Sequence, residues 1–175
     1  MVNHKVNHKT IELINSLKGK EKIKILFVCL GNICRSPAAQ GVMEALVAER
    51  GVANRFEIDS AGIGGWHVGD LPDKRMRVHA SRRGLELTHR ARQVRPYDFG
   101  EFDMVVAMDD NNVEELLDRA RTPEDERKIV RMTDFARHHA GAESVPDPYY
   151  EGAEGFELVL DLLEDSCSGL LDALT

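Results

Sequence analysis

The 175-residue chain contains only three cysteines and one tryptophan, and its aromatic content is 6%. An odd number of cysteines does not suit a disulfide framework, so the sequence predicts a protein of a reducing compartment, by default the cytoplasm. No apolar run approaches the ~20 residues of a membrane-spanning helix, and no membrane partner is expected. Residues 1–22 lack the apolar core of a secretory signal and the arginines of a transit peptide.

The chain also lacks the positive charge of a general nucleic-acid-binding protein. Its formal net charge is −7, which argues against a nucleic-acid partner. The charge is unevenly distributed, because residues 74–95 are strongly basic and no lysine or arginine follows Arg137. A solvated helix face followed by an acidic half explains this pattern. A basic rim beside an anionic ligand is the alternative.

The patterning predicts a single α/β domain over residues 23–175, preceded by a partly helical extension over residues 1–22. Residues 23–29 are apolar except for Lys24, as in a strand buried on both faces. Further strands are expected over 56–60, 102–108 and 128–132, and helices over 10–18, 36–50, 73–83, 111–120 and 153–174. This alternation predicts a central four-stranded parallel sheet with helices on both faces. Asn111 and Glu114 have the spacing of a capping box for the helix over 111–120.

The most informative stretch is ILFVCLGNICRSPAAQ, residues 25–40. The apolar strand ends at Cys29, Arg35 follows six positions later, and Ser36-Pro37 opens a helix. Ligands of open α/β sheets bind at the carboxyl ends of the strands. Backbone amides in such a turn, together with the positive end of the next helix, form a cradle for an anion. The sequence therefore predicts a phosphate-binding loop after the first strand.

Individual residues of this loop suit phosphate chemistry. Gly31 and Asn32 best tolerate the positive φ that a tight turn requires. Arg35 can donate two hydrogen bonds to one phosphate. The helix dipole favours the thiolate of Cys29, which lies in place for in-line attack on phosphorus. The predicted loop consists of Leu30, Gly31, Asn32, Ile33, Cys34, Arg35 and Ser36.

Other kinds of site fit this stretch less well. The ATP-binding pattern G-x4-G-K-[ST] is absent. Cys29 and Cys34 have no matching His or Cys pair, and Arg35 beside them would oppose a cation, so neither a metal nor a cofactor is expected. The alternative to a functional site is a purely structural role, with Cys29 in the core and Ser36 capping the helix. This alternative leaves Arg35 without a role.

Six segments in order resemble the low-molecular-weight protein tyrosine phosphatase family: VCLGNICRSPAAQ, DSAG, the lone Trp66, HRARQV, FDMVVAMDDNN and VPDPYY. The resemblance covers the chain from Ile23 to the final helix. It implies a metal-independent phosphatase that acts on phosphotyrosine in proteins through a phosphocysteine and is inhibited by its product, inorganic phosphate. In this resemblance Cys29 is the nucleophile, Arg35 holds the phosphoryl group, and Asp147 is the general acid and base. A turn-forming role in a proline-rich loop is the alternative for Asp147.

The resemblance also implies supporting roles. A network of Asn32, Ser36 and His89 would hold the loop, and Ser36 would donate a hydrogen bond to the thiolate. Trp66 and Tyr149 would form the walls of a pocket about one aromatic ring deep, which suits phosphotyrosine. Without the resemblance, Trp66 would be assigned to the core and His89 to the surface.

Two assignments stay open at this point, those of Asp109 and Cys34. Asp109 matches a carboxylate of the family, and a helix-capping role is the alternative. Cys34 could intercept oxidised Cys29 as a reversible disulfide partner, or it could simply fill a small apolar gap beneath the loop. Cys167 is expected to be buried as a small hydrophobic residue.

Related activities are less consistent with the sequence. Arsenate reductases of this fold use further cysteines in the middle of the chain, and none lies between Cys34 and Cys167. Arginine phosphatases of the family carry threonine after the loop asparagine, whereas this chain has Ile33, whose apolar side chain better suits a phenyl phosphate. A phosphotyrosine-binding module without activity is disfavoured because nucleophile, arginine and acid are all present.

Overall fold

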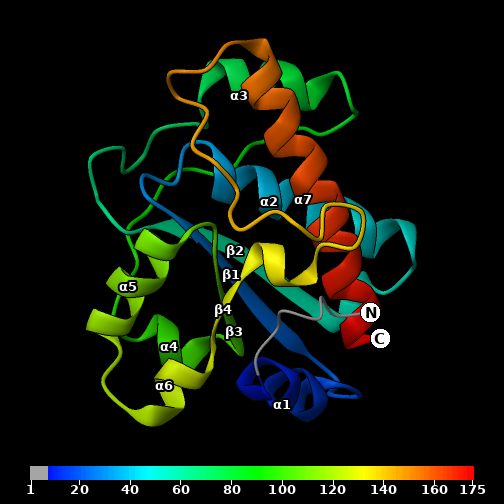
Figure 1. The fold of residues 1–175 in the computed structure, drawn as a ribbon, viewed down its shortest axis with the longest axis vertical. Coiled ribbons are helices and arrows are strands. Elements are labelled where there is room, and N and C mark those ends of the chain that lie inside the picture. The colour runs from blue at the N-terminus through cyan, green and yellow to red at the C-terminus, as the bar shows by residue number, and fades with distance from the viewer. Residues whose placement is uncertain (1–7) are drawn as a thin grey trace.

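The computed structural model describes residues 8–175 and confirms the predicted α/β class. Four parallel strands form the central sheet in the order β2-β1-β3-β4 (Figure 1). Their bounds are Ile23–Cys29 for β1, Phe56–Gly62 for β2, Met104–Ala107 for β3 and Ile129–Arg131 for β4. The central position of β1 brings the loop that follows it between its two neighbours, at the carboxyl edge of the sheet.

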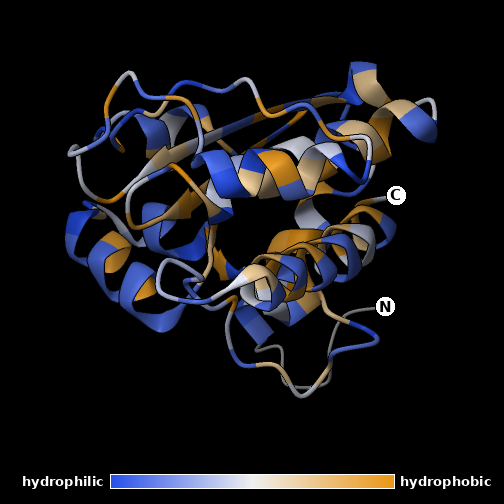
Figure 2. Ribbon diagram, turned by 90° about the horizontal axis from the view of Figure 1, so that it is seen from above, coloured by the Kyte–Doolittle hydropathy of each residue, from blue (hydrophilic) through white to orange (hydrophobic). Residues whose placement is uncertain are grey.

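Helices cover both faces of the sheet. The α-helices are α1 (His8–Leu17), α2 (Arg35–Glu49), α3 (Lys74–Ser81), α4 (Asp98–Glu101), α5 (Asp110–Arg119), α6 (Pro123–Arg127) and α7 (Ala153–Leu174). Helices α2 and α7 pack together on one face, and α4 and α5 cover the other. The outer turns of the helices are largely hydrophilic, whereas hydrophobic residues gather toward the interior (Figure 2). No helix among residues 8–175 is long and apolar enough to cross a membrane.

Strand β1 contributes side chains to two separate cores, as its continuous apolar run predicts. Ile25, Phe27 and Cys29 belong to the core beneath α2 and α7. Leu26 and Val28 belong to the core on the opposite face. Successive side chains of a strand point to opposite faces, so a strand covered by helices on both sides is apolar throughout.

The structure corrects several predicted boundaries. The short helices α4 and α6 were not predicted, because four or five residues show no helical period. The predicted strands over 102–108 and 128–132 are shorter in the structure. The predicted capping box at Asn111 and Glu114 is wrong: the N-cap of α5 is Asp109, whose side chain accepts the Asn112 N–H at 2.8 Å. Asp109 comes almost directly after β3 and has extended backbone, so the helix begins earlier than predicted.

The predicted helix over 10–18 is α1, and it packs against the rest of the domain. Ile14 and Leu17 are buried in the same core as α2 and α7. After the helix, Lys20 forms an ion pair with Asp103 at 2.6 Å. The first seven residues of the predicted extension lie outside the described residues.

Candidate active site

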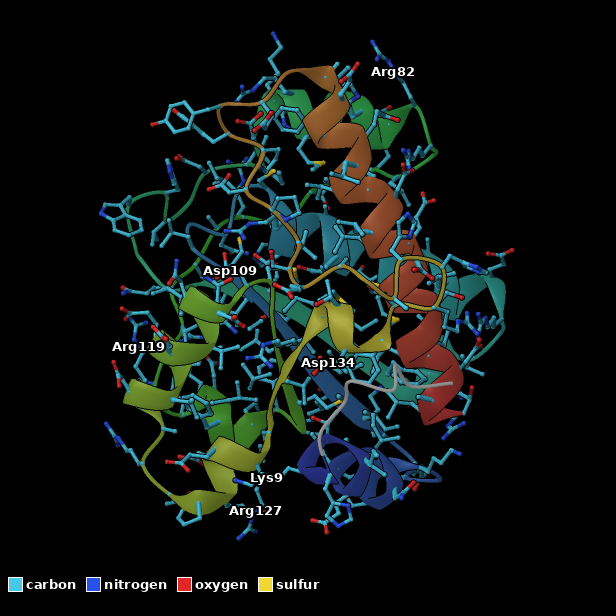
Figure 3. All side chains as sticks on the ribbon, viewed as in Figure 1. Lys9, Arg82, Asp109, Arg119, Arg127 and Asp134 are labelled. Carbon is cyan, nitrogen blue, oxygen red and sulfur yellow. The ribbon has the colours of Figure 1, made fainter. Side chains whose placement is uncertain are left out.

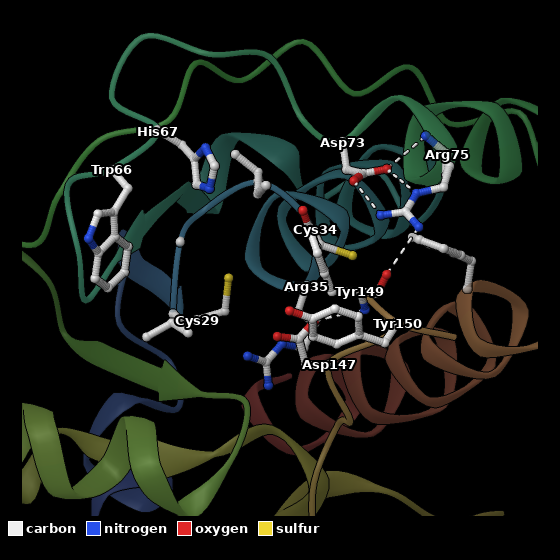
Figure 4. A pocket seen from close by; sticks show the side chains of 14 residues that line it. Cys29, Cys34, Arg35, Trp66, His67, Asp73, Arg75, Asp147, Tyr149 and Tyr150 are labelled. Carbon is white, nitrogen blue, oxygen red and sulfur yellow. Dashed lines mark hydrogen bonds and ion pairs between the residues drawn. The ribbon is translucent and has the colours of Figure 1, made fainter. Parts of the chain in front are cut away.

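The loop between β1 and α2 forms the floor of a pocket of about 270 Å³ (Figure 4). Cys29, at the end of β1, and Arg35, the first residue of α2, both line this pocket. Asp147 reaches the same pocket from the segment 145–150 that precedes α7, which we call the acid loop. The structure thus brings Asp147 to Cys29 and Arg35, although it lies more than 110 positions away from both in the sequence.

Asn32 fixes the conformation of the phosphate-binding loop. It is fully buried and, among residues 8–175, is the one non-glycine residue with a positive φ, at 56°. Its amide donates to the hydroxyls of Ser36 at 2.7 Å and Ser60 at 3.0 Å. Its carbonyl oxygen accepts from the Arg92 N–H at 3.0 Å and contacts His89 Nε2 at 2.9 Å. Four hydrogen bonds therefore hold a backbone conformation that most residues avoid.

The two other members of the predicted network lie on either side of Asn32. Ser36 Oγ is 3.0 Å from Cys29 Sγ. Because the Asn32 amide donates to this hydroxyl, the Ser36 hydrogen can be donated either to Cys29 Sγ or to the Ala61 carbonyl, which is farther away at 3.4 Å. Burial lowers the pKa of His89 despite the nearby Asp59 carboxylate. Because Asn32 Oδ1 can only accept, His89 Nε2 donates the hydrogen of their contact.

Two acceptors hold the Arg35 side chain in place near Cys29. The Arg35 side chain is buried, and Nη1 donates to Asp109 Oδ2 at 2.6 Å and to the Val145 carbonyl at 3.0 Å. Burial alone would lower the pKa of the guanidinium, but the negative charges of Cys29 and Asp109 raise it above its ordinary value. The guanidinium therefore stays charged, and two acceptors hold its Nη1.

Asp109 caps α5, which was one of its two predicted roles, and it also binds Arg35, because each carboxylate oxygen has a separate partner. Oδ2 accepts from Arg35, and Oδ1 accepts from the Asn112 N–H in the first turn of α5. The carboxylate lies at the carboxyl edge of the sheet, between β3 and α5 (Figure 3). One residue thus joins the phosphate loop to the helix on the other face of the sheet.

The acid loop presents Asp147 toward the pocket. Asp147 is exposed, and its Oδ1 accepts the Tyr149 N–H at 3.0 Å, a short-range turn bond that orients the carboxylate. The loop begins at Val145, which is buried and donates its N–H to the Met108 carbonyl at 2.8 Å. The base of the loop is therefore anchored to the end of β3, while its tip borders the pocket.

Four aromatic residues line the pocket, namely Trp66, Tyr149, Tyr150 and Phe156, and the sequence predicted the first two as its walls. Trp66 is 70% exposed and Tyr149 is 51% exposed, and both line the cavity. Figure 4 shows Trp66 on the side of the loop after β2 and Tyr149 on the side of the acid loop. Trp66 is therefore not a core residue, and its ring and that of Tyr149 border the cavity that Cys29 also lines.

Sequence reasoning missed Arg75, which connects the acid loop to the phosphate loop. The Asp73 N–H donates to the Ile33 carbonyl at 2.6 Å, and the Asp73 carboxylate caps α3 and binds the Arg75 guanidinium. Arg75 Nη1 then donates to the Tyr149 carbonyl at 3.1 Å, and its guanidinium lies over the Tyr149 ring. Asp73 at a predicted helix start was a visible capping signal. The contact between Arg75 and the acid loop depends on tertiary structure.

The three cysteines have different surroundings, and none forms a disulfide. Cys34 lines the pocket together with Cys29. Burial, and then the negative charge of Cys29, raise the pKa of the Cys34 thiol, so Cys34 stays protonated in this pocket. Cys167 is fully buried in the core beneath α2, as predicted.

Comparison with known proteins agrees with this geometry. A family model described as low molecular weight phosphotyrosine protein phosphatase matches residues 24–175. The chain belongs to this family. A Synechocystis relative named for the same family is 46% identical over 152 residues, which are 87% of this chain and 96% of the relative.

Solved structures of the family share the fold. A protein tyrosine phosphatase from Entamoeba histolytica, with Hepes in its active site, has a TM-score of 0.83 and 43% identity and covers 86% of this chain and 96% of its own. A Drosophila arginine phosphatase has a TM-score of 0.80 and 34% identity, with coverage of 86% and 96%. The relatives thus include enzymes named for two different phosphorylated residues.

Proposed function

We propose that this protein hydrolyses phosphotyrosine in proteins through a phosphocysteine intermediate. The observation that carries the proposal is the meeting of Cys29, Arg35 and Asp147 in one pocket flanked by Trp66 and Tyr149. Membership of the phosphotyrosine phosphatase family supports the same substrate. A catalytic thiolate persists only where it is kept reduced, which agrees with a cytoplasmic site of action.

In the first step, the Cys29 thiolate attacks phosphorus and the bond to the tyrosyl oxygen breaks. Asp147, as the carboxylic acid, gives its proton to the leaving phenolate. The Arg35 guanidinium and the amides of the loop stabilise the charge that develops on the phosphoryl oxygens. Ser36 donates its hydrogen to Sγ and so stabilises the thiolate, both as nucleophile and as leaving group.

In the second step, water attacks the phosphorus of the phosphocysteine. The Asp147 carboxylate, now deprotonated, takes a proton from this water, the P–S bond breaks, and the thiolate is regenerated. Inorganic phosphate leaves and Asp147 is again protonated. Because phosphate fits the same loop, it is expected to inhibit competitively.

Substitution of the nucleophile and of the acid tests the mechanism. Cys29→Ser should abolish turnover while the loop still binds phosphate or vanadate. Asp147→Ala should lower kcat by ~10²–10³ for phenyl phosphates with poor leaving groups and by much less for acidic leaving groups, which do not need the proton. A uniform loss across leaving groups would show that Asp147 is not the acid.

Phosphoarginine is the second candidate substrate, because a structural relative is named an arginine phosphatase. Ile33 lines the pocket and offers an apolar surface where a guanidinium would require a hydrogen-bond acceptor. We therefore expect kcat/KM to be higher for a phosphotyrosine peptide than for the matching phosphoarginine peptide. Ile33→Thr should narrow that difference, and a preference of the wild type for phosphoarginine would overturn the substrate assignment.

A further inference from the structure

One face of α3 carries positive charge that the catalytic site does not use. Lys74, Val78 and Arg82 follow one another at intervals of four residues, and Arg77 and Ser81 lie beside them on the same helical surface. Met76 and Ala80 lie on the opposite, buried face. The basic stretch noted in the sequence is therefore gathered along one side of a short helix.

Two neighbouring arginines, Arg82 and Arg83, differ in whether carboxylates neutralise them. Arg83 is paired with three carboxylates of α7, those of Glu157, Asp161 and Glu164, at 2.8–3.3 Å. Arg82, the preceding residue, lies at the outer edge of the molecule (Figure 3). Within residues 8–175, no carboxylate forms an ion pair with Lys74, Arg77 or Arg82. The cations that face α7 are neutralised, and those on the other side of α3 are not.

These three cations line a groove of about 580 Å³. The groove combines their charge with the apolar side chains of Leu71, which is 36% exposed, and Val78, which is 42% exposed. Its far wall is the segment 86–88, in which Glu86 is the one acidic residue that lines it. A groove with three cations, one carboxylate and two exposed apolar residues is complementary to an acidic chain with some apolar character.

The groove begins where the catalytic pocket ends. Asp73 lines the pocket and Lys74, the next residue, lines the groove. Consecutive Cα atoms are only ~3.8 Å apart, so the first turn of α3 separates the two cavities. From Lys74 to Arg82 the helix rises ~12 Å, which matches three or four residues of an extended peptide at ~3.3 Å each.

We infer that this groove docks an acidic segment of the phosphoprotein substrate that lies within a few residues of its phosphotyrosine. The inference rests on the proposed function and narrows it to one substrate class: phosphotyrosine flanked by Asp or Glu. Lys74, Arg77 and Arg82 attract the acidic residues, and Leu71 and Val78 contact apolar side chains among them. Since the molecule as a whole is acidic, this local charge also orients such a substrate as it approaches.

The test compares two phosphotyrosine peptides that differ in three flanking residues, Glu in one and Gln in the other. In one pair of peptides the three residues follow the phosphotyrosine, and in a second pair they precede it. At low salt, the wild-type kcat/KM should be ~10–100-fold higher for the acidic peptide in one of these arrangements, and 0.5 M salt should remove most of the difference. The triple variant Lys74→Glu/Arg77→Glu/Arg82→Glu should lose the preference and favour a lysine-flanked peptide.

Two controls separate docking from other effects. Turnover of p-nitrophenyl phosphate, which does not reach the groove, should change less than ~2-fold in the triple variant, and this also reports correct folding. Lys18→Glu/Arg121→Glu, which alters exposed cations outside the groove, should keep the peptide preference. If the wild type does not hydrolyse p-nitrophenyl phosphate at all, the proposed function itself is refuted.

Equal kcat/KM for acidic and neutral peptides in the wild type would overturn the inference. A milder triple variant, with Gln at all three positions, keeps the test valid if the Glu variant fails to fold. If the peptides are equivalent but vesicles containing phosphatidylserine bind the wild type and not the Gln variant, the face recognises an anionic lipid surface, and the inference is wrong.

Discussion

Replacement of Asn32 tests how the phosphate-binding loop is held together. Asn32→Ala removes four hydrogen bonds, to Ser36, Ser60, His89 and the Arg92 N–H. A buried hydrogen bond contributes about 1 kcal/mol net, so these amount to about 4 kcal/mol. Alanine at a φ of 56° adds about 1 kcal/mol. The expected loss is about 5 kcal/mol of the free energy of unfolding, a large share of the ~5–15 kcal/mol typical of a domain.

Asn32→Gly separates the two contributions. Glycine loses the same hydrogen bonds but tolerates a positive φ, so Asn32→Gly should be more stable than Asn32→Ala by about 1 kcal/mol. Urea unfolding measures both values, and the affinity for vanadate shows whether the loop still forms in the folded protein. Asn111→Ala, an exposed substitution on α5, is the control and should change stability by less than about 0.5 kcal/mol.

Two results would refute this reasoning. If alanine and glycine at position 32 destabilise equally, the positive φ carries no cost. If both change the free energy of unfolding by less than about 1 kcal/mol and leave vanadate affinity unchanged, the hydrogen bonds of Asn32 do not hold the loop.

Three further predictions concern the surroundings of the nucleophile. Trp66→Ala and Tyr149→Ala should each raise KM for aryl phosphates more than they lower kcat; a lower Tm with unchanged kinetics would contradict their role as walls. After peroxide and then dithiothreitol, the wild type should recover its activity through a disulfide of Cys34 that mass spectrometry detects, whereas Cys34→Ala should not recover; equal recovery would leave Cys34 a packing role. Arg75→Ala should lower kcat ~5–50-fold for poor leaving groups and little for p-nitrophenyl phosphate, because the acid loop loses its hydrogen bond. Arg75→Lys should rescue part of that loss, and an equal effect on all leaving groups would show that Arg75 does not position the acid.

The sequence alone determined the parts of this protein that are local. The apolar run at 23–29 identified a strand buried on both faces, because a strand with one face in water alternates apolar and polar residues. The short distance from Cys29 to Arg35 defined the phosphate loop, since a strand end and a helix start six residues apart leave little conformational choice. The helices α4 and α6 were missed, because four or five residues carry too little helical pattern. The cap of α5 was misplaced, because the helix begins at Asp110 and its N-cap is Asp109, two positions before the predicted capping box.

Tertiary structure decided what depends on contacts between distant segments. It gave Asp109 two simultaneous roles, one oxygen for Arg35 and one for α5, where the sequence left a choice. It linked the acid loop to the phosphate loop through Arg75, 74 positions away from its hydrogen-bond acceptor at Tyr149. It also separated Arg83, which the carboxylates of α7 neutralise, from Lys74, Arg77 and Arg82, which face the groove, because packing decides which side of a helix meets another helix.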